Sequence, residues 1–385
     1  MLLTLGFGTL DARQQAPAAP QTQVPATAPA APAPAVIPRP GPPRPAEPPA
    51  PAFPSTVKWS ETLASAPVTP PLVVGDRVVV ALQSGVLSSR IVADGREVWT
   101  AKLAVDQPVA ADADRLFVFS GRSLHALNAA DGVQVWTVDP GQPTAPVIAR
   151  GGWVIVATGE GVLALRAADG ATVWTKQPGA VSARPAIEGS TLYLPLTEGR
   201  LLAMDLATGA LLWERSVGVA PSEPLALTDR VCLGSDSRQF ICLDATSGAD
   251  VWRWPIGTRV IGPAAADESR IYFVAMDNFL RAVSRGSGNQ RWKNGLAYRP
   301  THGPVVMGGQ VAVPGITGEL IGFAASTGKS TGKLALSEKV AVDPAFVPPE
   351  QAGGIPMVVT ITGGLTTTWT LSAAVPAVEK PPEDK

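Results

Sequence analysis

A tandem repeat with a period of about 40 residues organises most of this chain. A turn dipeptide followed four residues later by tryptophan occurs six times, as in Asp94-Gly95 with Trp99 and Thr208-Gly209 with Trp213. Successive tryptophans of these units are 37, 38, 39, 39 and 40 residues apart. A proline that opens a short apolar run keeps the same period, at Pro71, Pro108, Pro146, Pro185, Pro224, Pro263, Pro304 and Pro344. Two markers in phase indicate a repeat architecture.

Each unit contains four short runs rich in β-branched and apolar residues. In one unit these runs begin at Pro146, Trp153, Gly161 and Ala171, and turns that contain glycine or aspartate separate them. The intervening segments are too short for crossover helices, so the four runs are expected to form an antiparallel meander. A four-stranded unit of about 40 residues is typical of a β-propeller blade.

The two ends of the repeat region predict a closed ring. Trp59 lies 40 residues before Trp99 and ahead of Pro71, so the run around Trp59 is an isolated fourth strand. The last unit starts at Pro344 and ends near Leu371 without a fourth strand. Pairing the two ends removes an open sheet edge. We therefore expect an all-β, eight-bladed β-propeller of four-stranded antiparallel blades over residues 55–372, with the N-terminal strand closing the last blade.

The repeated tryptophan is expected to be the main structural residue of each blade. In the unit that runs from Ala203 to Trp213, a small residue on the third strand precedes a glycine turn and the indole on the outer strand. We expect the indole to pack over the small residue and to cover the adjacent blade. Burial of the indole stabilises the fold by up to about 4–6 kcal/mol per tryptophan. The seventh blade has Gly332 in place of tryptophan and is predicted to be the least stable. The predicted structural tryptophans are Trp59, Trp99, Trp136, Trp174, Trp213, Trp252 and Trp292.

The chain outside the repeats has a different composition. Residues 1–13 are interpreted as a signal-peptide remnant or an ordinary disordered terminus. Residues 14–54 are predicted to be a disordered Pro/Ala-rich linker without core residues, with an SH3-type or WW-type ligand as the alternative. Residues 373–385 are predicted to be a disordered tail. A formal charge of −1 gives no long-range attraction for nucleic acid, and no apolar run is long enough for a transmembrane span.

Few residues could form a catalytic or metal site. The two histidines, His125 and His302, lie in different units, which leaves little material for a zinc site or a Ser-His-Asp triad. Cys232 and Cys242 are placed on the second and third strands of the fifth unit, with Cys242 in the position that Ala203 fills one unit earlier. We expect two small buried free cysteines, and a cross-strand disulfide is the alternative. No catalytic, cofactor or metal residue is assigned.

The binding surface is expected on the face where the second-to-third-strand hairpins and the connections between blades emerge together. Loops on that face vary between units while the turn before each tryptophan stays constant, which is typical of a fixed scaffold with an adaptable surface. The wider set on this face includes Arg122, Glu160, Arg184, Glu198, Arg215, Asn278, Phe279, Tyr298 and Glu319. We predict that a protein partner binds a cluster over blades four to six, formed by Arg200, Asp236, Arg238, Arg259, Asp277 and Arg299.

The tandem Ala-x-Asp-x-x-Thr-Gly-x-x-x-Trp pattern resembles the PQQ-type, or quinoprotein-like, repeats of eight-bladed propellers, from about Thr56 to Leu371. That family includes quinone-dependent dehydrogenases and also cofactor-free binding propellers. The size, the Pro/Ala-rich lead-in and the single propeller are similar to the branch of the outer-membrane β-barrel assembly factor B. This resemblance implies a non-enzymatic, monomeric scaffold in the periplasm or cell envelope, which binds the POTRA domains of the barrel-inserting subunit.

The sequence departs from both branches of this family. The assembly-factor branch carries a lipobox cysteine, whereas no cysteine precedes Cys232 here, so lipid anchoring would require an upstream start. The alternative function is a PQQ-dependent or other small-molecule oxidoreductase that uses the propeller funnel. The resemblance implies an adjacent cysteine pair for that activity, and the two cysteines here are ten residues apart. We therefore expect no enzyme activity and no cofactor.

Overall fold

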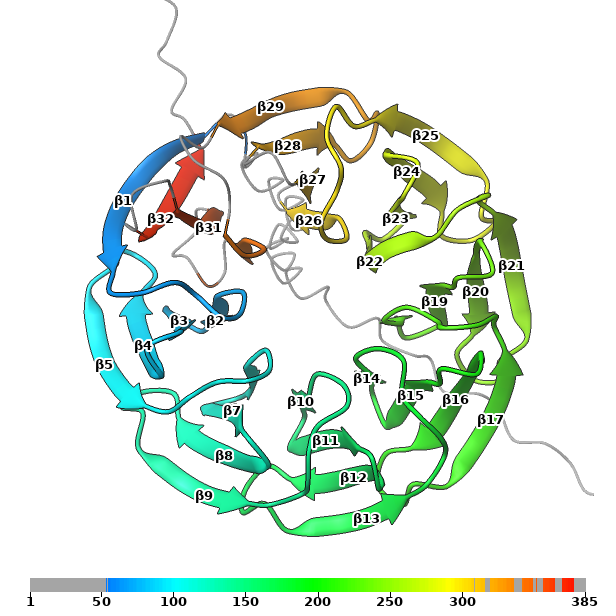
Figure 1. Cartoon of the computed structure of the whole chain (residues 1–385). Helices are drawn as coiled ribbons and strands as arrows, with labels where there is room; N and C mark the ends of the chain where they lie inside the picture. Colours follow the sequence, from blue (N-terminus) through cyan, green and yellow to red (C-terminus); the bar gives the residue numbers. More distant parts are fainter. Residues whose placement is uncertain are drawn as a thin grey trace, which may run out of the picture. The chain divides into compact units, whose positions relative to one another are not determined.

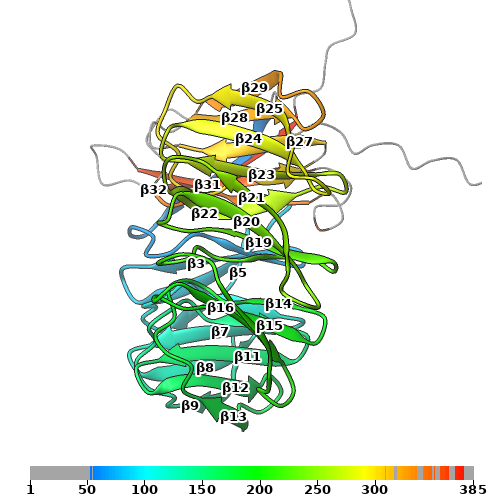
Figure 2. The same ribbon diagram turned by 90° about the vertical axis from the view of Figure 1, so that its right-hand side faces the viewer.

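The computed structural model describes residue 53 and residues 55–307, 309–315, 319–335, 341–348, 351, 356–363 and 369–376. Within these ranges every regular element is a β-strand, and the 32 strands form eight four-stranded sheets. Figure 1 shows the sheets arranged around a common centre, and Figure 2 shows the ring from its side. No helix that could span a bilayer occurs in these ranges. The predicted all-β, eight-bladed propeller is confirmed.

Each of the first seven blades is a meander of four consecutive antiparallel strands, with the first strand near the centre and the fourth on the rim (Figure 1). Blade one contains β2 (Leu72–Val74), β3 (Arg77–Leu82), β4 (Val86–Ile91) and β5 (Glu97–Lys102). Blade two contains β6 (Ala110–Asp112), β7 (Arg115–Ser120), β8 (Ser123–Asn128) and β9 (Gln134–Val138). Blade three contains β10 (Ile148–Arg150), β11 (Trp153–Thr158), β12 (Gly161–Arg166) and β13 (Thr172–Lys176). Blade four contains β14 (Ala186–Glu188), β15 (Thr191–Pro195), β16 (Arg200–Asp205) and β17 (Leu211–Ser216).

The second half of the ring repeats this order. Blade five contains β18 (Leu225–Ala226), β19 (Arg230–Gly234), β20 (Gln239–Asp244) and β21 (Asp250–Pro255). Blade six contains β22 (Val260–Ala266), β23 (Arg270–Ala275), β24 (Phe279–Ser284) and β25 (Gln290–Gly295). Blade seven contains β26 (Val305–Met307), β27 (Gln310–Pro314), β28 (Glu319–Ala324) and β29 (Ser330–Ala335). Blade eight combines β30 (Ala345–Val347), β31 (Met357–Gly363) and β32 (Trp369–Pro376) with β1 (Ser55–Leu63).

The first strand of the chain closes the ring. β1 pairs antiparallel with β32, with Thr56 opposite Val375 and Thr62 opposite Thr370. The predicted closure of the last blade by the N-terminal strand is therefore confirmed. β32 continues to Pro376, so the sheet extends past residue 372, where the propeller was expected to end.

The predicted signal remnant at 1–13, most of the predicted linker at 14–54 and residues 377–385 of the predicted tail lie outside the described residues. Phe53 is the exception within the linker. Its side chain is only 1% exposed and packs against Leu320, Leu334 and Val358. The expectation that the linker contains no core residue is wrong at Phe53, because this side chain fills apolar space between blades seven and eight.

Each repeated tryptophan connects two neighbouring blades. Trp213 lies opposite Ala203 within blade four, and its indole Nε1 donates a hydrogen bond of 3.0 Å to the Ala245 carbonyl of blade five. The same bond to the next blade joins Trp59 to Val92, Trp99 to Ala129, Trp136 to Ala167, Trp174 to Leu206, Trp252 to Arg285 and Trp292 to Ala325. The predicted packing of the indole over a small residue and against the adjacent blade is confirmed.

The glycine of the turn in the next blade belongs to the same contact. Gly209 has a φ of +66°, and a Cβ atom on it would lie 2.8 Å from Cδ2 of Trp174. The equivalent glycines, each against the tryptophan of the preceding blade, are Gly95, Gly132, Gly170, Gly248, Gly288 and Gly328. The glycine and the tryptophan of one repeat therefore serve two different contacts between blades, although they stand four residues apart in the sequence.

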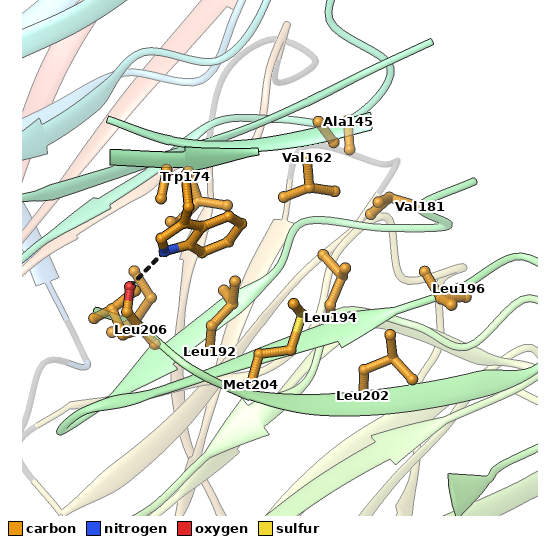
Figure 3. Close-up of a cluster of buried hydrophobic side chains, with 14 residues drawn as sticks. Ala145, Val162, Trp174, Val181, Leu192, Leu194, Leu196, Leu202, Met204 and Leu206 are labelled. Carbon is orange, nitrogen blue, oxygen red and sulfur yellow. Dashed lines mark hydrogen bonds between the residues drawn. The ribbon is translucent and has the colours of Figure 1, made fainter. Parts of the chain in front are cut away.

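The hydrophobic core lies between the blades. Figure 3 shows one such cluster, in which Trp174 of blade three lies against Leu192 and Met204 of blade four and donates a hydrogen bond of 2.9 Å to the Leu206 carbonyl. Each interior side chain therefore stabilises the contact between two sheets as well as its own sheet. The ring provides a rigid support for the loops at its two ends.

Blade seven lacks the tryptophan of the other repeats. Gly322 of β28 lies opposite Gly332 of β29, in the positions that Ala203 and Trp213 occupy in blade four. Because blade seven has no indole that donates a hydrogen bond to the next blade, we expect backbone amides of β27 and β28 to exchange faster than those of β15 and β16. Native-state hydrogen exchange resolved by peptide measures this difference. Slower exchange in blade seven than in blade four would contradict the prediction.

The two cysteines form a disulfide bond between β19 and β20. Cys232 lies directly opposite Cys242, with a Cα–Cα distance of 4.1 Å, and both side chains are fully buried. The expectation of two free cysteines is wrong, because the cross-strand register places both side chains on the same face and within bonding reach. Cys242 does occupy the small-residue position, since it lies opposite Trp252.

Reduction of this bond is expected to lower the free energy of unfolding by about 2–3 kcal/mol, because the link closes a loop with a sequence separation of 10. Urea unfolding with and without dithiothreitol measures the effect. A Cys232→Ala/Cys242→Ala variant should unfold at the same urea concentration under both conditions. An unchanged midpoint for the parent protein on reduction would disprove the stabilising role.

Candidate functional site

The hairpins and the connections between blades are hydrogen-bonded to one another on one face of the ring, which we call the loop face. In blade five, the Asp236 amide donates to the Val219 carbonyl of the incoming connection at 2.9 Å. In blade six, the Met276 amide donates to the Arg259 carbonyl at 2.9 Å. The loops that carry the side chains of this face are therefore fixed to one another by backbone hydrogen bonds.

Three exposed arginines lie on the loops of blades five and six, and we call Arg238, Arg259 and Arg299 the basic sector. Arg238 ends the hairpin between β19 and β20, with a φ of 61° and a carbonyl that accepts a bond of 2.9 Å from the Ile256 amide. Arg259 lies 3.9 Å from Asp236, and its side chain remains 59% exposed. The side chains of Arg238 and Arg299 have no hydrogen bond or ion pair with any described residue.

A cavity of about 270 Å³ opens beside Arg259 and Asp236. The connections into blades four, five and six form its wall, so three blades contribute to one concave site. Its other lining residues are small or apolar: Ser182, Ala183, Ala220, Pro221, Ser222, Ser235, Val260, Ile261 and Gly262. A hollow lined by small polar and apolar residues, with a charged pair at its edge, has the composition of a pocket that receives one side chain of a partner.

Asp277 and Arg200, two of the six residues predicted to bind a partner, have partners within the protein. Asp277 accepts a bond of 2.9 Å from Arg281, which is buried between blades five and six. Burial opposes ionisation of Asp277, but the hydrogen bonds and charge of Arg281 outweigh it and lower the pKa of that carboxyl. Arg200 binds Glu198, Glu214 and the Pro178 carbonyl. The structure therefore brings together Asp236, Arg238 and Arg259, and it assigns Asp277 and Arg200 to internal ion pairs.

An aromatic and cationic cluster stands beside the basic sector and was not predicted as a unit. The Lys293 ammonium lies 3.7 Å from the ring centre of Phe279, and the Arg281 guanidinium lies 5.5 Å from the same ring. Arg281 is also 5.9 Å from the ring of Trp254. The available sequence signal was Trp252-Arg253-Trp254, in which a second indole follows the repeated one by two residues and projects from the same side of the strand.

Two residues of the wider predicted set do not belong to the loop face. Tyr298 is 4% exposed, and its hydroxyl donates to the Val313 carbonyl at 2.5 Å, so it stabilises the contact between blades six and seven. Arg215 donates to the carbonyls of Ser247 and Gly248, in the outer turn of blade five, at 3.0 and 2.9 Å. Both are long side chains that the sequence pattern placed near loops but that reach into a neighbouring blade.

Two of the three acidic residues that we note on the loops of blades two to four are paired with arginines. Asp139 lies 3.5 Å from Arg122, Glu198 is bound by Arg200, and Glu160 is exposed at the hairpin of blade three. Of these acids, only Glu160 forms no ion pair with a described residue.

A second cavity, of about 280 Å³, is lined by the inner strands of blades three to six and contains Arg150, Arg184 and Glu223. Burial raises the pKa of the Glu223 carboxyl, while the charges of Arg184 and His302 act in the opposite direction. No group of three or more His, Cys, Asp or Glu side chains suited to a metal ion occurs among the residues that the structure describes.

Comparison with known proteins identifies related chains. The family model described as outer membrane protein assembly factor BamB matches residues 83–227, 220–297 and 277–374. No curated protein matches the sequence.

Three solved structures share the fold. BamB from Moraxella catarrhalis is 22% identical with a TM-score of 0.66, and the match covers 83% of this chain and 97% of that one. The computationally designed Ika8 protein is 12% identical with a TM-score of 0.68, with 82% and 99% covered. The quinohemoprotein alcohol dehydrogenase from Comamonas testosteroni is 15% identical with a TM-score of 0.65, with 86% and 78% covered. At these identities the structural matches show the fold alone.

Proposed function

This chain belongs to the family of outer membrane protein assembly factor BamB, and we propose that it is a non-enzymatic scaffold of the cell envelope that binds a protein partner through the basic sector. The observation that carries this proposal is the group of exposed arginines at blades five and six. Arg238 and Arg299 are unpaired among the described residues, and Arg259 has a single distant acid at 3.9 Å. Unpaired arginines beside aromatic side chains are frequent anchors of protein interfaces.

The resemblance and the family membership support POTRA domains of the barrel-inserting subunit as the partner. The positive sector favours an acidic patch on the POTRA surface that faces it. The propeller itself is proposed to be monomeric, and the Pro/Ala-rich segment 14–54 is proposed to be a spacer.

A periplasmic location is supported by the buried Cys232–Cys242 disulfide, because such bonds persist in oxidising compartments. A cytoplasmic location would expose this bond to a reducing thiol pool during folding. Fractionation of cells that express the full chain, together with thiol labelling of the denatured protein, tests both parts. Recovery of the reduced protein in the cytoplasm would exclude the proposed compartment.

The binding proposal is tested with the purified full chain and the POTRA region of the barrel-inserting subunit encoded in the same genome. Biolayer interferometry should show saturable binding that weakens as ionic strength rises, because exposed charges contribute to the association. A soluble β-barrel protein of lipocalin size, with a net charge similar to that of the POTRA region, replaces that region as the control for nonspecific adsorption. Absence of saturable binding to any POTRA domain would contradict this partner.

The alternative function is a PQQ-dependent oxidoreductase. The inner cavity with Arg184 and Glu223, together with the fold shared with a quinohemoprotein alcohol dehydrogenase, is the observation in its favour. The absence of adjacent cysteines in the sequence weighs against it. Incubation with PQQ and Ca²⁺ followed by gel filtration distinguishes the two functions, because only the enzyme would retain quinone absorbance and support dye-linked alcohol oxidation.

A further inference from the structure

The contact between blades seven and eight is built differently from the other contacts between blades. In the others, an indole reaches forward onto the glycine turn between the third and fourth strands of the next blade. Blade eight has no such turn, because its third strand, β32, is near the C-terminal end of the chain and its fourth strand, β1, is near the N-terminal end. A tryptophan at position 332 would therefore have no turn to pack against, and the sequence has Gly332 there.

Phe53 fills the apolar space at this position from the opposite direction. It precedes β1, so it stands where the missing turn of blade eight would be, and its ring packs back onto blade seven. The buried cluster around it combines Leu320 and Leu334 of blade seven with Val358 and Ala374 of blade eight. The Gln310 side-chain amide, buried in β27, donates a hydrogen bond of 3.2 Å to the Phe53 carbonyl.

Gly322 completes the pocket for this ring. A Cβ atom at Gly322 would lie 2.6 Å from Cδ2 and 3.1 Å from Cγ of Phe53. In the other seven blades the same position carries a side chain: Ser89, Ala126, Ala164, Ala203, Cys242, Ala282 and Ala373. The two irregular glycines of blade seven, Gly322 and Gly332, thus have one common explanation.

We propose that the contact between blades seven and eight forms a binding pocket for one aromatic side chain, and that Phe53 of the same chain is its ligand. The pocket recognises an aromatic ring through Gly322 and the surrounding aliphatic side chains, and it recognises the extended backbone through Gln310. Occupation of the pocket fastens Phe53 to the ring two residues before the start of the β1–β32 pairing at Ser55. This proposal is independent of the partner that the loop face binds.

A double-mutant cycle in the full chain tests the proposal. Phe53→Ala and Gly322→Ala should each lower the melting temperature by roughly 5–10 °C, the first by emptying the pocket and the second by excluding the ring. Gly322→Ala should lower the melting temperature by much less in the Phe53→Ala background, because the ring is gone and only the Thr331 hydroxyl, 2.8 Å from the added Cβ atom, has to move. Val57→Ala, at an exposed position of β1, is the matched control.

Added benzene provides an independent measurement. An emptied apolar cavity binds small aromatic molecules, so saturating benzene should raise the melting temperature of Phe53→Ala and leave that of the parent protein unchanged. If Phe53→Ala does not fold, Phe53→Leu takes its place in the same cycle with a smaller shift. Additive effects of the two substitutions, or a parent-like melting temperature for Phe53→Ala, would overturn the proposal.

Discussion

Replacing Trp174 with alanine is expected to lower the free energy of unfolding by about 3–5 kcal/mol. The indole is 8% exposed, packs against Leu192 and Met204 of the next blade, and donates a hydrogen bond of 2.9 Å to the Leu206 carbonyl. The substitution removes this apolar contact and leaves the carbonyl without its donor. The midpoint of urea unfolding measures the loss.

The neighbouring residue supplies the control for this substitution. Val173 stands next to Trp174 on the same rim strand but is 46% exposed, so Val173→Ala should change the unfolding free energy by less than about 0.5 kcal/mol. Similar losses for the two variants would show that the indole contact does not stabilise the ring.

The other half of the same contact can be tested at glycine. Gly189 and Gly209 both lie in blade four with positive φ, at 56° and 66°. A Cβ atom at Gly189 has no neighbour within 4 Å, whereas at Gly209 it would meet Trp174. Gly189→Ala should therefore cost about 1 kcal/mol for backbone strain alone, and Gly209→Ala should cost about 1–3 kcal/mol more. Equal losses of unfolding free energy for the two variants would show that the Trp174 indole moves away from the added Cβ atom at no cost.

The combined substitution Arg238→Glu and Arg259→Glu is expected to weaken binding to the POTRA region by about 10-fold or more at low salt. Both side chains are exposed on the loop face, and Arg259 also lines the cavity at Asp236. Reversal of two charges repels an acidic partner surface and also removes any guanidinium contacts. Titration by biolayer interferometry at several salt concentrations measures the loss, which should shrink as salt increases.

A variant with the same change in net charge separates local contacts from the overall charge. Arg96 and Arg291 are both exposed and lie outside the basic sector, so Arg96→Glu/Arg291→Glu should retain binding close to that of the parent protein. Circular dichroism confirms that both double variants are folded. Undiminished binding by Arg238→Glu/Arg259→Glu would move the interface away from blades five and six while leaving a scaffold function intact.

The fold could be predicted from the sequence because its signals repeat. The glycine turn and the tryptophan recur once per blade, and the isolated strand at Trp59 complements the incomplete unit after Pro344. Phe53 could not be predicted in this way, since it occurs once and lies in a proline-rich stretch whose composition indicates a spacer. Its role depends on a turn that is missing only where the two ends of the chain meet.

The sequence predicted where the residues of the candidate site lie better than it predicted which side chains they pair with. The meander places hairpins and connections on one face, which allowed Arg238 and Arg259 to be selected from the sequence. Asp277 and Arg281 belong to one hairpin. Their pairing depends on the Arg281 side chain lying between Asp277 and the Trp254 ring. The Cys232–Cys242 bond depends on a register that differs by a single residue from one that would separate the two sulfurs. Three-dimensional packing determines this ion pair and this disulfide, and residue type alone does not.

The pairing of β1 with β32 also constrains how the protein is made. During synthesis from the N-terminus, β1 emerges first and its partner strand emerges last, so the nascent chain carries an unsatisfied edge until the final sheet is available. Seven sheets can assemble from local hairpins in the meantime, but the ring can only be sealed afterwards. A circular permutant whose new ends lie in a hairpin turn of blade four would make blade eight contiguous and divide blade four between the two ends of the chain, so the last sheet to form should change from blade eight to blade four.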